Sequence, residues 1–296
     1  MSRATWAARL PSRPFICSAL ALRSLHHLNI STFMRFALGL EYDGSAYAGW
    51  QAQASAVGVQ ALVEKALSCV ADHPVEIMAA GRTDAGVHAM MQVVHFDSPS
   101  IRSERGWMLG ATSNLPKQVS VLWVREVPDA FHARYSAQAR SYRYFILNRR
   151  IRPAIGADYV SWIREPLDVS PMHAAAQLLI GEHDFTSFRA AECQSRTPMR
   201  YVHEVSVTRV GEIVELAVTA NAFLHHMVRN IAGVLIAIGT GERSVEWAAE
   251  VLHARDRRQG GITAPPGGLY LSGVRYAAAL HLPSEPKDRR PLLVSG

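Results

Sequence analysis

The stretch VEIMAAGRTDAGVHAMMQVVHFD, residues Val75–Asp97, sets two apolar runs on either side of a polar turn. The first run, Val75–Gly81, predicts a buried strand that stops at a glycine, and Gln92–Asp97 predicts a second strand. The turn between the two runs places Arg82 and Asp84 two residues apart. Because buried charge is costly unless it is paired or used, these two side chains require a partner or a ligand.

The chain on both sides of this stretch alternates between strands and helices. Alternating apolar residues predict strands at Arg35–Tyr42 and Val119–Val127. Apolar residues at helical spacing predict helices at Val59–Val70 and Ser103–Pro116. Together with the two strands above, the order is β-α-β-β-α-β, which is typical of the split βαβ, ferredoxin-like unit.

A similar succession follows in the second half of the chain. Its predicted elements are strands at Arg140–Asn148 and Gly268–Tyr276, a hairpin at Val202–Asn221 that turns near Gly211, and helices at Ser170–Asp184, Phe223–Gly241 and Ser244–Asp256. The predicted fold class is therefore α/β (α+β), with two ferredoxin-like-derived domains, residues 34–130 and 131–282. We expect their sheets to join and a cleft to lie between the domains.

The two ends of the chain differ in composition from the part between them. Residues 1–33 hold four arginines and no acid, and they show no clear apolar period. Three interpretations remain open for this segment: a misassigned start with Met34 as the true one, a disordered arm, or a transit peptide. The polar, proline-containing tail 283–296 is expected to be flexible.

The composition of the chain excludes several classes of protein. The chain has 296 residues, of which 49% are hydrophobic, so it is long enough to bury a sizeable core. No apolar run approaches the roughly 18 residues that a membrane span requires. Its three cysteines form no CxxC pair, which argues against a disulfide framework and a cysteine zinc site and favours the reducing cytoplasm. The net charge of +6 includes the four arginines of residues 1–33, so net charge is weak evidence for a nucleic-acid partner.

The polar turn has two interpretations. An ionised Asp84 in a cleft can serve as a nucleophile, a base or a metal ligand, and the flanking glycines let backbone or ligand approach closely. Alternatively, the turn is structural and Arg82 forms a surface ion pair with Asp84. No nearby spacing matches a known metal motif, and the phosphate-loop pattern is absent from the chain.

The segment Phe131–Pro153 is basic and aromatic. It contains no acid, and its aromatic residues interleave with arginines, which suits phosphates and stacked bases. An RNA-binding surface is the favoured interpretation, and a solvated basic face with core aromatics is the alternative. The six arginines are Arg134, Arg140, Arg143, Arg149, Arg150 and Arg152.

The segment Asn221–Ile231 carries polar residues within a predicted helix. His225 and His226 are adjacent, so they are expected to point to different sides of the helix and to make a poor metal pair. Arg229 lies in otherwise apolar surroundings and therefore needs an anionic partner.

Six segments of the chain, taken in order, resemble the TruA family of tRNA pseudouridine synthases. They are YDGSAYAGWQ (42–51), AAGRTDAGVHAMMQVVHFD (79–97), FHARYSAQARSYRYFILN (131–148), GEHDFTSFRAAECQSRTP (181–198), NAFLHHMVRNIAGVLIAIGTG (221–241) and GLYL (268–271). The resemblance runs from about Met34 to Leu282, which leaves residues 1–33 outside the family pattern.

The resemblance implies a role for each residue that matches a family motif. Asp84 matches the catalytic aspartate, and Arg82 matches the arginine that helps to extrude the target base. Tyr142 matches the tyrosine that packs against the uracil, with a hydroxyl that could assist proton removal, and Arg229 matches an arginine that pairs with the catalytic aspartate. The implied tRNA contacts are Arg102, Phe131, His132, Ala133, Arg134, Tyr135, Arg150, Glu192, Cys193, Gln194, Ser195 and Arg196.

The resemblance also implies the reaction and its partners. Family members isomerise uridine to pseudouridine at positions 38, 39 and 40 of the tRNA anticodon stem-loop. They act as homodimers and need no metal or organic cofactor. Two other functions remain as alternatives. One is a non-catalytic RNA-binding module, and the other is a glycoside or nucleoside hydrolase, which would need a second carboxylate such as Asp72 or Asp97 beside Asp84.

Overall fold

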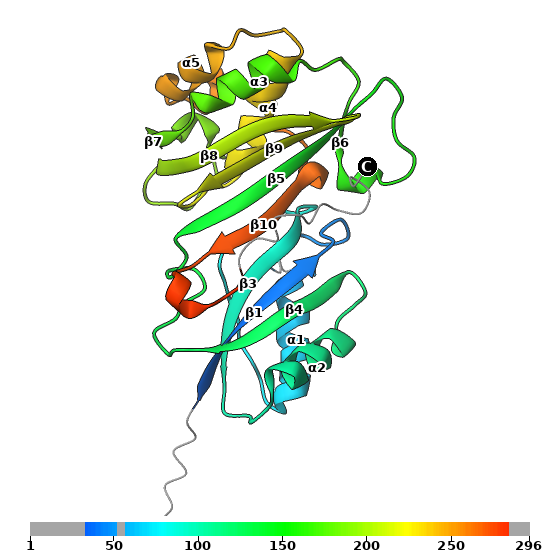
Figure 1. The fold of residues 1–296 in the computed structure, drawn as a ribbon, viewed down its shortest axis with the longest axis vertical. Coiled ribbons are helices and arrows are strands. Elements are labelled where there is room, and N and C mark those ends of the chain that lie inside the picture. Colours follow the sequence, from blue (N-terminus) through cyan, green and yellow to red (C-terminus); the bar gives the residue numbers. More distant parts are fainter. Residues whose placement is uncertain (1–32, 52–56, 284–296) are drawn as a thin grey trace, which may run out of the picture. The chain divides into compact units, whose positions relative to one another are not determined.

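The computed structural model describes residues 33–51 and 57–283, and within these residues the strands form one ten-stranded mixed sheet (Figure 1). The expectations for the extension 1–33 and the tail 283–296 concern residues that lie, except for Phe33 and Pro283, outside the described part. No helix in the described residues is long and apolar enough to cross a membrane.

The first half of the sheet has the predicted element order. Its strands lie in the order β4-β1-β3, with β2 paired to β3, and all these pairings are antiparallel. Trp107 of the second helix packs against Phe36 and Phe96 of the sheet, with ring centroids 5.6 and 5.0 Å away. The elements are β1 (Met34–Tyr42), α1 (Val59–Ala71), β2 (Met78–Ala79), β3 (His88–Ser98), α2 (Glu104–Asn114) and β4 (Val119–Val127).

The second half continues the sheet in the order β10-β5-β9-β8-β7, with β6 paired to β5. The predicted hairpin is present as β8 and β9, and Gly211 in its turn has a positive φ of 57°. The elements are β5 (Ala139–Asn148), β6 (Ser161–Ile163), α3 (Val169–Gln177), β7 (Gly181–Asp184), β8 (Met199–Val210), β9 (Ile213–Ala220), α4 (Met227–Gly239), α5 (Trp247–Ala254) and β10 (Leu269–Arg275).

The last strand joins the two halves. β10 pairs in parallel with β3 through Tyr270 and Leu271, and on its other side it pairs antiparallel with β5. The expected joining of the two sheets is therefore confirmed in the form of one continuous sheet (Figure 1). The parallel contact begins at His88, directly after the polar turn, so the turn lies where the halves meet.

Several predicted elements were wrong in extent. The strand expected at Gln92–Asp97 begins earlier, at His88, and the helix expected at Ser244–Asp256 begins only at Trp247. The strand expected at Val75–Gly81 is reduced to two residues, β2. The helix expected to reach Asp184 ends at Gln177, and β7 follows it, beginning at a glycine with a φ of 104°. The helix expected from Phe223 begins only at Met227, because His226 has a left-handed backbone with a φ of 62°.

Candidate active site

The polar turn after β2 is held by hydrogen bonds from neighbouring elements. The hydroxyls of Tyr42 and Thr83 lie 2.8 Å apart, and the Gln92 side-chain amide donates to the Gly81 carbonyl at 2.7 Å. The Trp50 backbone N–H donates to the Thr83 carbonyl at 2.9 Å. The chain can approach this closely because residue 49 is a glycine, at which a Cβ would lie 2.5 Å from that same carbonyl oxygen. These contacts fix the backbone from which the Asp84 side chain projects.

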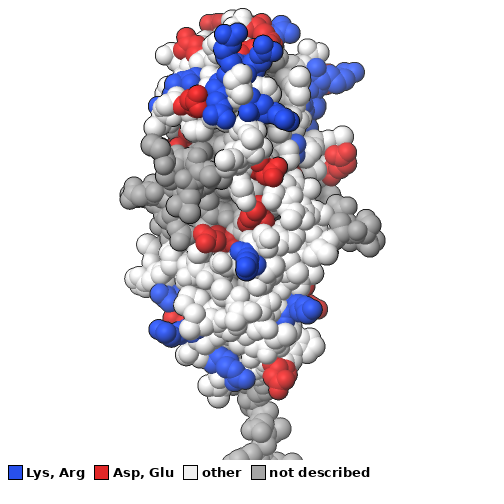
Figure 2. All heavy atoms as spheres, turned by 90° about the vertical axis from the view of Figure 1, so that its right-hand side faces the viewer, with Lys and Arg blue, Asp and Glu red and all other residues white. Residues whose placement is uncertain are grey.

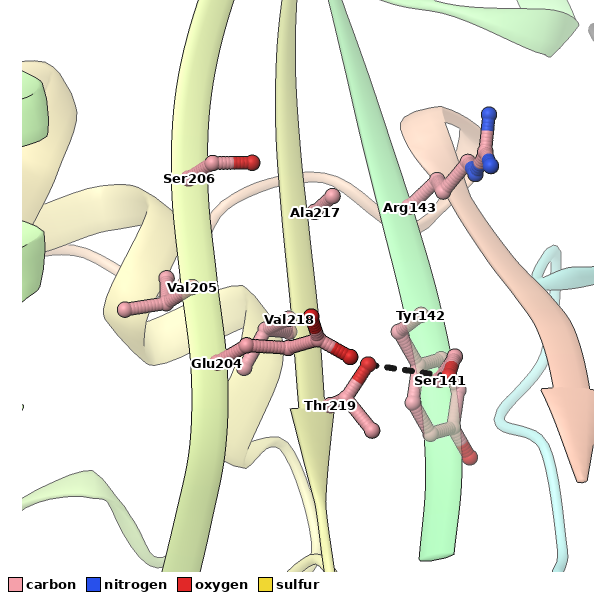
Figure 3. A pocket seen from close by; sticks show the side chains of 9 residues that line it. All are labelled: Ser141, Tyr142, Arg143, Glu204, Val205, Ser206, Ala217, Val218 and Thr219. Atoms are coloured by element: carbon pink, nitrogen blue, oxygen red, sulfur yellow. Dashed lines mark hydrogen bonds between the residues drawn. The ribbon is translucent and has the colours of Figure 1, made fainter. Parts of the chain in front are cut away.

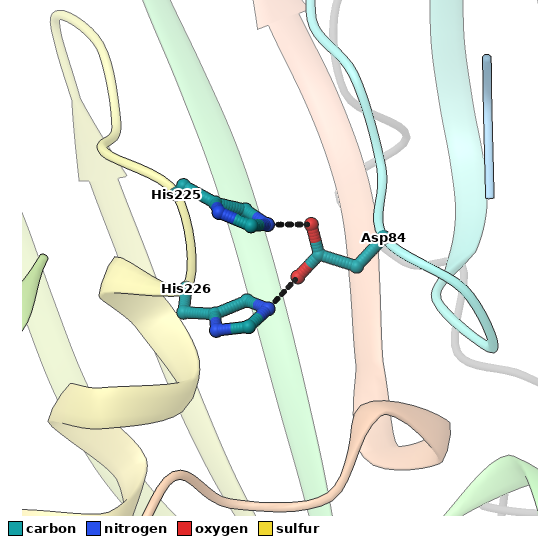
Figure 4. A group of neighbouring side chains, drawn as sticks. All are labelled: Asp84, His225 and His226. Atoms are coloured by element: carbon teal, nitrogen blue, oxygen red, sulfur yellow. Dashed lines mark ion pairs between the residues drawn. The ribbon is translucent and has the colours of Figure 1, made fainter. Parts of the chain in front are cut away.

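Three side chains from the start of α4 and the two residues before it surround the Asp84 carboxylate. Figure 4 shows two of them, His225 and His226. His225 Nε2 lies 3.2 Å from Oδ1, and His226 Nε2 lies 3.3 Å from Oδ2. Arg229 Nη1 donates to Oδ2 at 3.3 Å. The Asp84 side chain keeps 23% of its surface exposed, so the carboxylate is held and still accessible.

The two histidines do not point to different sides of a helix, and that expectation was wrong. Both residues precede α4, and the left-handed backbone of His226 turns the two rings toward the same carboxylate, with centroids 4.0 Å apart. Burial lowers the pKa of His226, and the nearby positive charges add to this effect, although Asp84 opposes it.

Arg229 has the anionic partner that its apolar surroundings required. Its Nε donates to the Ala264 carbonyl at 2.8 Å while its Nη1 reaches Asp84, so two groups fix the orientation of the guanidinium. The segment with Ala264 crosses α4 closely because residue 233 is a glycine, at which a Cβ would lie 1.8 Å from the Ile262 carbonyl oxygen. Only 14% of the Arg229 side-chain surface is exposed.

Tyr142 of β5 forms an aromatic wall close to this carboxylate. It is buried, and its ring packs edge-on against Phe223 with centroids 4.9 Å apart. Burial raises the pKa of the Tyr142 phenol, and the charge of Asp84 raises it further. That this hydroxyl assists proton removal stays a prediction.

A depression over β5, β8 and β9 lies on the other side of the sheet (Figure 3). Side chains alternate between the two faces of a strand, so Ser141 and Arg143 face this depression whereas the Tyr142 ring faces the opposite way. Ser141 and Thr219 share a hydrogen bond of 2.9 Å across it. This depression is therefore not part of the Asp84 site.

The basic segment Phe131–Pro153 is only partly available for phosphates, because half of its six arginines are already engaged. Arg143 pairs with Glu215 at 3.3 Å, and Arg149 pairs with Glu212 at 3.4 Å. Arg140 is largely buried, and it donates to the carbonyls of Ala80, Ala137, Arg134 and Asn221. The three that remain, Arg134, Arg150 and Arg152, are exposed.

The predicted tRNA-contacting residues fall into three groups. Phe131 and Ala133 are buried, so their side chains stabilise the loop and do not reach its surface. Cys193 is partly buried, and its sulfur accepts a hydrogen bond of 3.4 Å from the backbone N–H of His225. This bond links the segment Glu192–Arg196 to the Asp84 site. The remaining members are exposed or partly exposed: Arg102, His132, Arg134, Tyr135, Arg150, Glu192, Gln194, Ser195 and Arg196.

Arg82 is exposed, and among the described residues it is not an ion-pair partner of Asp84. The alternative of a surface pair between these two residues is therefore wrong. Figure 2 shows that, on one face, lysines and arginines gather over the second half together with acidic side chains. The charge there is mixed, which agrees with the weak evidence from net charge.

Comparison with known proteins shows the family to which the chain belongs. A family model described as tRNA pseudouridine synthase matches residues 40–136 and 175–277, which include Asp84, Tyr270 and the start of α4. The chain belongs to the tRNA pseudouridine synthase family. The synthase matches several relatives that are named tRNA pseudouridine synthase A, and the match covers nearly the whole length of each relative. The relative from Coxiella burnetii is 58% identical over 252 residues, covering 85% of this chain and 97% of its own length.

Two further relatives of the synthase carry the same name. The protein from Methylococcus capsulatus is 56% identical over 267 residues, which cover 87% of this chain and 98% of the relative. The protein from Aeromonas salmonicida is 58% identical over 253 residues, which cover 86% of this chain and 94% of the relative.

Sequence reasoning missed two contacts of the synthase site, those of His225 and His226 with Asp84. The only sequence signal was the proximity of the pair to Arg229, which was already expected to face an anion. The hydrolase alternative requires a second carboxylate beside Asp84, and neither of the two candidates from the sequence lies there. Asp97 is at the other end of β3 and pairs with Arg35 at 2.7 Å, and Asp72 ends α1.

Proposed function

We propose that this synthase converts uridine to pseudouridine at positions 38, 39 and 40 in the anticodon stem-loop of tRNA, with Asp84 as the catalytic carboxylate. The observation that supports it best is the Asp84 carboxylate, which is fixed by Arg229 and the two histidines yet keeps an exposed edge. Family membership and the three relatives named tRNA pseudouridine synthase A support the same reaction.

The reaction is an isomerisation, so no atoms are gained or lost. The N1–C1′ glycosidic bond breaks, the uracil turns, and C5 bonds to C1′. The proton that leaves C5 is balanced by the one that N1 gains. The proposed carboxylate is that of Asp84, which Arg229 orients by donating from Nη1 to Oδ2.

The target uridine must leave the base stack before it can reach Asp84. Unstacking costs a few kcal/mol, which protein contacts must offset. Arg82 is exposed at the edge of the polar turn and is suited to occupy the vacated space or to hold a phosphate. Tyr142 and Phe223 present aromatic rings near the carboxylate, where a uracil can stack.

The surface around the turn offers groups for the RNA strand. The Tyr135 side chain is 77% exposed, and the Arg134 guanidinium lies 5.7 Å from its ring centroid. An exposed ring beside an arginine suits a base and its phosphate. The other proposed contacts are Arg102, His132, Arg150, Glu192, Gln194, Ser195 and Arg196.

Three further parts of this proposal concern the whole protein. The enzyme acts as a homodimer in the cytoplasm, without a metal or organic cofactor in its reaction. Each chain has a domain of residues 34–130, which carries Asp84, and a domain of residues 131–282, which carries Arg229. The RNA lies in the cleft between these two domains.

Pseudouridine mapping on an unmodified tRNA transcript tests the proposal. We expect the wild type to convert the anticodon-arm uridines, and we expect Asp84→Asn to bind the transcript without converting it. Asp72→Asn is the matched control, because Asp72 is exposed at the end of α1 and its φ of 60° suits asparagine. Full conversion by Asp84→Asn would falsify the catalytic role. Binding without conversion by the wild type would instead favour the RNA-binding module.

A further inference from the structure

Three groups that bind metal ions converge beside the start of β3, where the two halves of the sheet join. The Nε2 atoms of His225 and His226 and a carboxylate oxygen of Asp84 all lie within 4.8 Å of one another (Figure 4). Each residue is only partly buried, so an ion can reach the cluster from solvent.

The distances between the histidine nitrogens and the carboxylate oxygens are compatible with those in a zinc coordination shell. Zinc binds imidazole nitrogen at about 2.0–2.1 Å and carboxylate oxygen at about 2.0–2.2 Å, usually in a tetrahedron, so neighbouring ligand atoms lie roughly 3.4 Å apart. The two nitrogen–oxygen distances, from His225 to Oδ1 and from His226 to Oδ2, are 3.2 and 3.3 Å. Three protein ligands leave the fourth position open to water, as in catalytic zinc sites.

We propose that Asp84, His225 and His226 form a reversible binding site for a zinc-class divalent transition metal ion, and that a bound ion inhibits the enzyme. The ion occupies the carboxylate oxygens that the RNA substrate needs. The proposed binding site is argued only from the positions of the three side chains, whereas the proposed inhibition rests on the proposed function.

The neighbouring charge sets the strength and selectivity of this site. Arg229 Nη1 lies 3.3 Å from Oδ2 and repels a cation, so binding is weaker than at a site with an unopposed carboxylate. Two imidazoles select zinc, cobalt or copper and disfavour magnesium, which prefers oxygen ligands. We therefore expect magnesium at the concentrations used for tRNA to leave the site free.

Cobalt(II) is a suitable probe because its visible absorption reports the ligand geometry. Tag-free full-length protein is freed of metal with a chelator and titrated with cobalt chloride. We expect saturable binding of one cobalt per chain, displacement of the cobalt by zinc chloride, and no displacement by magnesium chloride. His225→Gln, His226→Gln and Asp84→Asn should each raise the dissociation constant at least about tenfold, since each removes one of three ligands.

His253→Gln on α5 is the matched control, because it removes an exposed histidine distant in sequence from the cluster and should leave binding unchanged. A thermal melt of each variant shows whether it is folded, and at least one folded ligand variant suffices. The absence of saturable cobalt binding by the wild type, or wild-type affinity in all folded ligand variants, would overturn the site.

The inhibition is measured separately on the tRNA transcript. We expect zinc to reduce conversion by the wild type at the same concentrations that displace cobalt, and a chelator to restore it. Undiminished conversion by the zinc-loaded protein would overturn the inhibitory role. A protein that binds cobalt but converts no uridine at all would contradict the proposed function and leave the metal site standing.

Discussion

Arg229 and Asp84 are 145 positions apart in the sequence, yet the Nη1 atom of one lies 3.3 Å from the Oδ2 atom of the other. Asp84 belongs to the turn before β3, and Arg229 belongs to the first turn of α4. The contact therefore joins the two halves of the sheet at the carboxylate that the proposed reaction uses. Its loss should affect the reaction more than it affects folding.

Replacement of Arg229 tests this relationship. In Arg229→Lys the charge is kept, but one ammonium group cannot reach both Asp84 and the Ala264 carbonyl in the same geometry. A hydrogen bond to a charged group contributes about 1.5–3 kcal/mol, which corresponds to a fall in kcat of roughly 10- to 160-fold. Single-turnover conversion of a tRNA transcript measures the loss. Arg258→Lys, at a highly exposed position, serves as control, and an equal loss there would contradict the assignment.

Gly233 allows the segment that orients Arg229 to cross α4. In Gly233→Ala the added Cβ would lie 1.8 Å from the Ile262 carbonyl oxygen, so the backbone must shift. We expect a loss of about 1–3 kcal/mol in the free energy of unfolding together with reduced conversion. Urea unfolding measures the first effect. Gly106→Ala is the control, because only the Ser103 hydroxyl is near its Cβ position, and a similar loss there would show that the crossing is not the cause.

Arg140 connects the polar turn to the loop that follows β4. Its guanidinium donates to the carbonyls of Ala80, Arg134 and Asn221, so Arg140→Met leaves these groups unpaired. We expect faster amide hydrogen exchange in residues 131–138 and a KM for tRNA that rises more than kcat falls. Arg152→Met, at an exposed position of the same basic segment, should leave exchange in this loop unchanged. Unaltered exchange in Arg140→Met would refute the connecting role.

His95 makes the same loop sensitive to acid. Burial lowers its pKa to about 4, and its Nδ1 accepts the Ala133 N–H at 3.1 Å, which requires the neutral ring. The unfolded chain, with a pKa near 6.5, binds a proton between pH 6.5 and 4 that the folded chain does not bind. Stability therefore falls as the pH falls through this window, by up to about 3 kcal/mol.

Denaturant unfolding at pH 7 and pH 5 measures this dependence. In His95→Phe the difference in stability between the two pH values should be smaller than in the wild type, whereas His253→Phe, at an exposed position, should keep it. A difference that is unchanged in His95→Phe would assign the acid sensitivity to other groups.

Local patterns predicted most elements well. The alternation in Val119–Val127 predicted β4 to the residue, and the helical spacing that begins at Val59 predicted α1 to within one residue. The β2 strand is short because its segment pairs only at Met78 and Ala79 with β3, and no local pattern indicates how much of an apolar run finds a partner strand.

The site was predictable only in part. The residues of the polar turn and Arg229 were identified because each placed charge in apolar surroundings. The histidine pair was misjudged because it was assigned to a regular helix, and the left-handed backbone of His226 has no signature in sequence, since only glycine adopts it readily. Whether Arg134 is exposed and whether Arg140 is hydrogen-bonded depend on contacts between segments that are distant in the sequence. The spacing of apolar residues gives no information about such contacts.

The position of β10 has a consequence for biosynthesis. This strand is the last of the sheet to be made, yet it lies between β3 and β5 at the centre of the sheet. While the nascent chain is shorter than about residue 269, the two halves have no strand to bridge them. The stretches of β3 and β5 that pair with β10, residues 88–89 and 139–144, then lack that partner strand. The position of Asp84 relative to Arg229 therefore depends on a strand pairing that only the residues Leu269–Arg275 supply.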